Sequence, residues 1–177
     1  MTTTQLHLFN GFYLVVLAIV AILTRATPRR IEGAMAGGAA IGLLSLVIIP
    51  IGERAGWWHF ALSWEPYFLT LMEIDSALTG FVFLITWRIA RRFGGRGLVV
   101  AALIAMLIGP VRDYWAATKV FPQWGGYGPG IAPVLAISGG YVLVGIVGHG
   151  VMRLVAGPAE VDRLARRPWE PRQSSAV

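Results

Sequence analysis

Five runs of mostly apolar residues, each close to twenty residues long, alternate with short polar segments along the chain. A helical run of this length crosses a hydrocarbon core of roughly 30 Å. The pattern predicts five membrane-spanning helices, at about 8–24, 33–52, 66–87, 97–116 and 131–152. We therefore expect an all-α integral membrane protein. Residues 1–155 would form one five-transmembrane-helix bundle, and residues 156–177 a basic cytoplasmic tail that is partly disordered.

The positive charges predict how this bundle crosses the membrane. Twelve of the fifteen Lys and Arg residues fall in the segments 25–30, 88–96 and 153–172, which alternate with segments poor in basic residues. Basic loops remain on the cytoplasmic side of a membrane. We therefore expect a multi-pass protein of the cell membrane with its N-terminus outside and its C-terminus in the cytoplasm. No basic residue precedes the first apolar run, so we expect that run to be kept as a span rather than cleaved.

Composition narrows the classes of function. Charged residues make up only 14% of the chain and hydrophobic residues 56%, with a mean hydropathy of +0.65, which excludes an ordinary soluble domain. The net charge of +6 is placed at helix ends, as topology requires, so we expect no nucleic-acid partner. The chain has no cysteine, which excludes disulfides and thiol chemistry. Its three histidines lie in separate segments, so we expect no metal site and no cofactor.

Carboxylates and one arginine gather at the outer ends of the predicted spans. Glu73 and Asp75 lie within the third span, about 20–22 Å from its inner end at 1.5 Å per residue. Arg112 lies at the same depth on the fourth span, so we expect it to pair with one of these carboxylates. Ionisable groups at this depth are costly and usually functional. This group of three residues is the centre of the predicted site.

The predicted site has an acid and a set of binding residues. We expect Glu73 or Asp75 to be the catalytic acid, with Glu65 or Asp113 as a second carboxylate. Glu73 and Asp75 point to different faces of a helix, and which of them faces the pocket stays open. The expected substrate-binding residues are His59, Trp64, Tyr67, Arg112, Tyr114 and Trp115.

Structural roles are the alternatives for several of these residues. Glu65 precedes a proline and could only complement a helix N-terminus. The ion pair of Arg112 could hold two helices together without chemistry. The tryptophans could form a belt at the membrane interface.

Two stretches carry a resemblance to a known family. The segment SWEPYF at 63–68 resembles a stretch of the small integral-membrane terpene cyclases of meroterpenoid pathways. The segment FPQWGGYGPGIAPVLAISGGY at 121–141 is similar to the closing segment of those enzymes. The resemblance implies that Glu65 is an acid of the cyclisation reaction. Ser138 stands where the family carries an aspartate, and the family has seven spans.

The leading hypothesis is an integral-membrane enzyme that uses intramembrane carboxylates for acid/base chemistry. It would cyclise or isomerise an apolar isoprenoid or lipid-like substrate. One alternative is a non-catalytic membrane subunit or a protein that binds a lipid, a carotenoid or a quinone. Another is a proton-coupled carrier that works as a homo-oligomer.

Overall fold

The structure is a computed structural model that describes residues 3–61, 67–120, 122–123 and 125–159 of the 177-residue chain. Its elements in chain order are α1 (Thr3–Thr24), α2 (Pro28–Arg54), β1 (Trp58–Phe60), α3 (Tyr67–Trp115), the π-helix η1 (Ala116–Val120), β2 (Gly125–Tyr127) and α4 (Ile131–Ala156). Within these described residues, four helices are long and apolar enough to cross a membrane. The all-helical prediction is therefore confirmed, apart from two three-residue strands.

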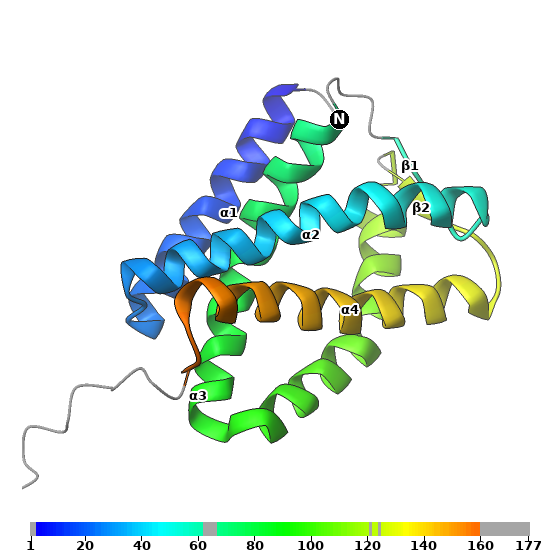
Figure 1. Cartoon of the computed structure of the whole chain (residues 1–177). Coiled ribbons are helices and arrows are strands. Elements are labelled where there is room, and N and C mark those ends of the chain that lie inside the picture. The colour runs from blue at the N-terminus through cyan, green and yellow to red at the C-terminus, as the bar shows by residue number, and fades with distance from the viewer. Residues whose placement is uncertain (1–2, 62–66, 121, 124, 160–177) are drawn as a thin grey trace, which may run out of the picture.

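The predicted third and fourth spans both lie in the long helix α3. This helix has 49 residues and is interrupted at Gly94, whose φ of 62° and ψ of −156° are not helical. Glycine adopts a positive φ at little energetic cost because it has no Cβ atom, which explains why a glycine lies at this bend. Figure 1 shows α3 turning back on itself at the bottom of the molecule, so that it forms two arms, 67–93 and 95–115.

Helix α2 begins earlier than the predicted position 33. The Thr27 hydroxyl accepts a hydrogen bond of 3.4 Å from the backbone N–H of Arg30, and Pro28 occupies the first turn. A hydroxyl cap followed by proline is a typical helix start. The hydroxyl accepts from an N–H group that has no partner within the helix, and the proline has no N–H group to satisfy. The helix therefore includes Arg29 and Arg30, which lie before the predicted start of this span.

The core forms where α2 packs against α3 and α4. A Cβ atom built on Gly37 would lie 2.6 Å from the Gly148 carbonyl oxygen and 3.0 Å from the Phe83 ring. Small residues at this crossing let the two backbones approach closely. The buried apolar side chains around the crossing are Leu17, Ala34, Ile41, Phe83, Leu84, Trp87 and Met152.

A buried arginine fastens the start of α2 to the end of α4. Arg30 is 2% exposed, and its guanidinium donates hydrogen bonds of 2.6 Å and 2.9 Å to the carbonyl oxygens of Gly157 and Pro158. The same guanidinium lies 5.2 Å from the ring centre of Trp87. We call this the arginine end of the bundle.

The opposite end carries a small sheet that the sequence did not predict. Strands β1 and β2 pair antiparallel, with His59 opposite Gly126 and Phe60 opposite Gly125. The pairing joins the α2–α3 connection to the α3–α4 connection, and Figure 1 shows both strands beside the end of α2. We call this the sheet end.

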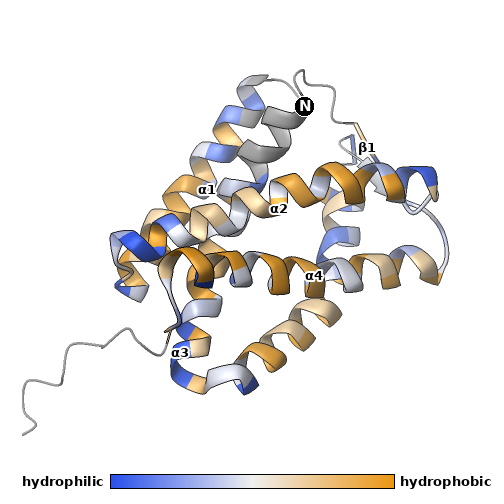
Figure 2. Cartoon of the chain, in the orientation of Figure 1, coloured by the Kyte–Doolittle hydropathy of each residue, from blue (hydrophilic) through white to orange (hydrophobic). Residues whose placement is uncertain are grey.

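The outside of the bundle is apolar along most of its length. Large side chains such as Ile22, Leu107 and Leu154 are 75%, 68% and 86% exposed. In Figure 2 the hydrophilic segments lie mainly at the helix ends and at the bend of α3, and the helices between them are apolar. This distribution is typical of a protein whose sides face lipid.

Candidate functional site

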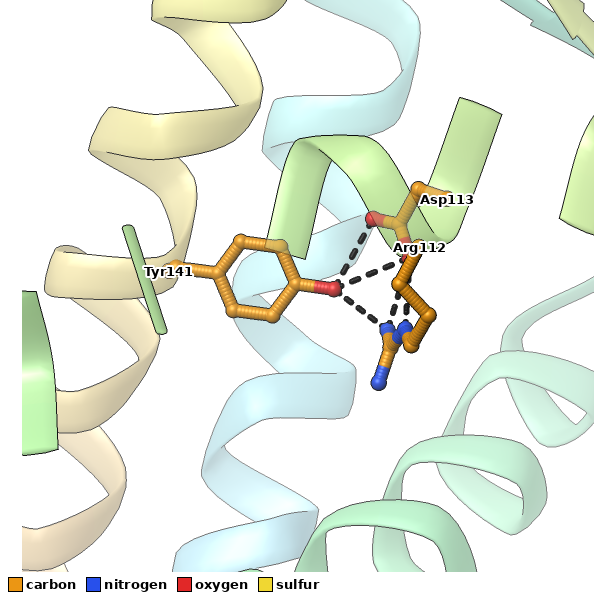
Figure 3. Close-up of polar contacts among 3 residues, drawn as sticks. All are labelled: Arg112, Asp113 and Tyr141. Atoms are coloured by element: carbon orange, nitrogen blue, oxygen red, sulfur yellow. Dashed lines mark hydrogen bonds and ion pairs between the residues drawn. The ribbon is translucent and has the colours of Figure 1, made fainter. Parts of the chain in front are cut away.

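Three side chains from α3 and α4 form the most complete polar cluster at the sheet end. Arg112 donates from Nε and Nη2 to Asp113 Oδ1, at 3.0 Å and 2.7 Å. The Tyr141 hydroxyl lies 2.8 Å from Asp113 Oδ2 and 3.0 Å from Oδ1, and it also contacts Arg112 Nη2 (Figure 3). Asp113 thus has a cationic and a hydroxyl partner at once.

The backbone of α3 makes room for this cluster. Tyr141 of α4 packs over Gly109, where an added Cβ atom would lie 2.2 Å from the tyrosine ring. The Arg112 guanidinium lies 5.5 Å from the centre of the same ring. Glycine at 109 therefore lets Tyr141 reach across to the last turn of α3 and hold both charged residues.

Aromatic rings surround the cluster on the side of the sheet. Tyr114 and Tyr127 are stacked with their ring centres 4.7 Å apart, and Phe60 packs edge-on to Tyr127 at 6.3 Å. Burial, together with the nearby charge of Asp113, raises the pKa of the Tyr127 hydroxyl, so this tyrosine is neutral at physiological pH. The sheet therefore contributes an apolar wall with one neutral hydroxyl group, that of Tyr127.

Asp75 lies in a different environment, on the first arm of α3. Its carboxyl group forms a side-chain hydrogen bond with Ser45 of α2. Its second oxygen, Oδ2, is buried and has no hydrogen-bond partner among the described residues. Thr79, one turn further along, has its hydroxyl next to Gly38 of α2. The face of α3 that carries Asp75 is thus turned toward α2.

We expected Arg112 to form an ion pair with a carboxylate of the predicted third span. The described side chains show no such pair. Arg112 pairs with Asp113, its neighbour in the sequence. Tyr114 lies at the aromatic wall, stacked on Tyr127, and its role in substrate binding stays a prediction. Trp115 is 60% exposed and His59 is also exposed, so neither is buried at the cluster.

Four predicted residues cannot be placed at the site. Trp64 and Glu65 lie outside the described residues. Tyr67 and Glu73 belong to α3, but the structure describes only their place in the helix and not their side chains.

Two polar residues that the sequence interpretation did not select are buried in the bundle. Asn10 of α1 is 4% exposed, and neither atom of its amide has a hydrogen-bond partner among the described residues. His149 of α4 contacts Thr86 of α3, with 3.0 Å between Nδ1 and the hydroxyl oxygen. The signal for Asn10 was its place in the apolar run of α1, where a buried amide is costly.

Within the described part of the chain, no group of three or more His, Asp or Glu side chains could hold a metal ion. Comparisons of the chain with protein-family models, with curated proteins and with solved structures each find no match.

Proposed function

We propose that this protein is an integral-membrane enzyme that moves protons to and from an apolar isoprenoid or lipid-like substrate, with Asp75 as the acid. The observation that supports this proposal most is the contrast between two carboxyl groups. Asp113 is held by Arg112 and Tyr141, whereas Asp75 has one hydroxyl partner and one buried oxygen without a partner among the described residues.

This contrast fits a division of labour. An unpaired carboxylate in an apolar interior is costly, so Asp75 is expected to carry its proton there. It can donate that proton to a carbon–carbon double bond, which leaves a carbocation on the substrate and a carboxylate on Asp75. Asp113, paired with Arg112, is proposed as a further negative charge for this cation, and aromatic rings stabilise cations.

The reaction then closes in one of two ways. In an isomerisation, the carbon next to the cation loses a proton to a carboxylate and the double bond is shifted. In a cyclisation, a second double bond attacks the cation before that proton is lost. Glu65 and Asp113 remain the candidates for the second carboxylate, and Glu73 is the alternative to Asp75 as the acid. The aromatic residues of the sheet end are proposed to border the substrate.

We also propose that α3 crosses the membrane twice, which gives five spans. A continuous helix of 49 residues would be about 74 Å long at 1.5 Å per residue, more than twice the hydrocarbon thickness. The bend at Gly94 lies among Arg88, Arg92 and Arg96, and the arginine end carries Arg30 and Arg153. Basic residues favour the cytoplasm, so the N-terminus would lie outside and the C-terminus inside.

Solvent deuterium provides a direct test of proton transfer. The protein, reconstituted in nanodiscs in D₂O, would be incubated with unsaturated isoprenoids, and the products analysed by mass spectrometry. We expect wild type to incorporate deuterium and Asp75→Asn to lower the rate by roughly 100-fold or more, the usual contribution of a general acid. Glu32→Gln, which removes an exposed carboxyl group on α2, is the matched control. If Asp75→Asn incorporated deuterium at the rate of the wild type, Asp75 would not be the acid.

A non-catalytic membrane subunit is the second candidate. Gly139, Gly140, Gly145 and Gly150 of α4 each have open space where a side chain would begin. Small residues facing outward let another membrane helix pack closely. This function would be favoured if no isoprenoid acquired deuterium and a second protein co-purified in stoichiometric amount.

A further inference from the structure

The Arg112 guanidinium uses only part of its hydrogen-bonding capacity. Its Nε and Nη2 atoms face Asp113 and Tyr141. Its other terminal nitrogen, Nη1, forms no hydrogen bond with any residue that the structure describes, and Figure 3 shows one terminal nitrogen pointing away from both partners. The arginine side chain is 62% exposed, whereas that of Asp113 is only 19% exposed. The triad therefore presents a cationic edge outward and keeps its anion covered.

An apolar strip of α3 leads to this edge. Ile108 and Trp115 are each 60% exposed and Val111 is 70% exposed. These residues are spaced three and four apart, so they lie on one face of the helix beside Arg112. In a membrane this strip would contact acyl chains, and the guanidinium would lie at the point where the strip meets the sheet end.

The two partners of Arg112 preorganise this edge for binding. Asp113 and Tyr141 fix the plane of the guanidinium, so little side-chain freedom remains to be lost on binding. Guanidinium groups are always charged, and their paired N–H groups match the geometry of phosphate and carboxylate oxygens. Leaving such donors without a partner beside lipid is costly.

We infer that Arg112 docks the oxyanion headgroup, a phosphate or a carboxylate, of an amphiphile whose apolar tail lies along the strip of Ile108, Val111 and Trp115. This inference rests on the proposed function, and it names the substrate class as an anionic amphiphile rather than a pure hydrocarbon. The ligand approaches sideways from the membrane. Its headgroup is held at Arg112 while its tail is directed toward the bundle.

The experiment measures binding to the purified full-length protein in detergent, using three probes. Dihexanoylphosphatidic acid has both the anion and the tails, dihexanoylglycerol has the tails alone, and inorganic phosphate has the anion alone. We expect phosphatidic acid to bind at least 10-fold more tightly than either of the others. Arg112→Gln should weaken its binding at least 10-fold, and Arg112→Lys should restore part of the loss. Lys119→Gln, which removes an exposed charge two turns away, is the matched control and should bind as wild type does.

A second variant keeps the inference falsifiable if Arg112→Gln does not fold. Asp113→Asn removes the charge that offsets Arg112 but keeps an oxygen that can accept from its guanidinium. The variant should therefore strengthen phosphatidic acid binding, by about threefold or more, whereas a triad with no docking role predicts no change. The inference is overturned if Arg112→Gln binds as wild type does, if Lys119→Gln loses as much affinity, or if Asp113→Asn gains none. Binding of inorganic phosphate as tight as that of the lipid would also overturn it. Asp75→Asn should bind normally, so failure of the proposed acid is seen in turnover and failure of this docking site in binding.

Discussion

Tyr141 holds two charges of opposite sign with a single hydroxyl group. Its oxygen lies within 3.0 Å of both carboxylate oxygens of Asp113, and it also contacts Arg112. A hydrogen bond to a charged group contributes more to stability than one between neutral groups. The free energy of this cluster therefore depends strongly on one oxygen atom of α4.

Replacing that oxygen gives a prediction at the residue scale. Tyr141→Phe keeps the ring over Gly109 but removes the hydroxyl, so we expect the free energy of unfolding to fall by about 1.5–3 kcal/mol. Unfolding in mixed detergent micelles measures this change. Tyr114→Phe is the control, because it removes a hydroxyl whose hydrogen bond, to the neutral carbonyl oxygen of Gly128, is long at 3.4 Å. Equal stability of the two variants would contradict the role given to Tyr141.

Sequence reasoning located the charged residues of this cluster but not their partners. The depth of Arg112 follows from counting residues along a helix, and Asp113 was selected as a second carboxylate. The partner of Arg112 depends on the rotation of the helix and on the reach of a flexible side chain, neither of which a residue count gives. Tyr141 was missed because only the packing over Gly109 brings it to the end of α3.

At the scale of elements, the crossing of α2 and α4 leaves no room for a side chain. Gly37→Ala would place a methyl group 2.6 Å from the Gly148 carbonyl oxygen, which belongs to the backbone and cannot rotate away. We expect a loss of about 1–3 kcal/mol in the free energy of unfolding, typical of an overpacked contact. Gly145→Ala of α4 meets no atom within 4 Å and should be neutral or slightly stabilising. Thermal unfolding of both variants in the same detergent compares them, and a neutral Gly37→Ala would show that the helices are further apart.

The elements themselves were predictable to different degrees. Long apolar runs predicted the helices, because this signal is local. The strands β1 and β2 gave no such signal. Each has three residues, and their pairing depends on two connections that meet only after α3 has turned back at Gly94.

At the scale of the whole molecule, the five-span topology can be tested on a clean background because the chain has no cysteine. Single cysteines would replace the exposed residues Ala55, Gly95 and Gln123, followed by labelling of intact cells with a membrane-impermeant maleimide. We expect labelling at 55 and 123 from outside, and at 95 only after the membrane is permeabilised. Labelling at 95 from the same side as the other two would show that α3 does not cross twice.

The small sheet imposes an order on the assembly of the protein. Strand β1 emerges from the ribosome before α3, and its partner β2 emerges only after α3 is complete. Until β2 is made, the edge of β1 and the aromatic residues around it lack their partner strand. The sheet end therefore cannot reach its final structure while α1, α2 and α3 are being inserted. The last helix to be inserted, α4, follows directly on β2. Closure of the sheet and completion of the Tyr141 cluster are thus neighbouring late events in biogenesis, and a chain stopped before α4 would lack the third member of its charged cluster.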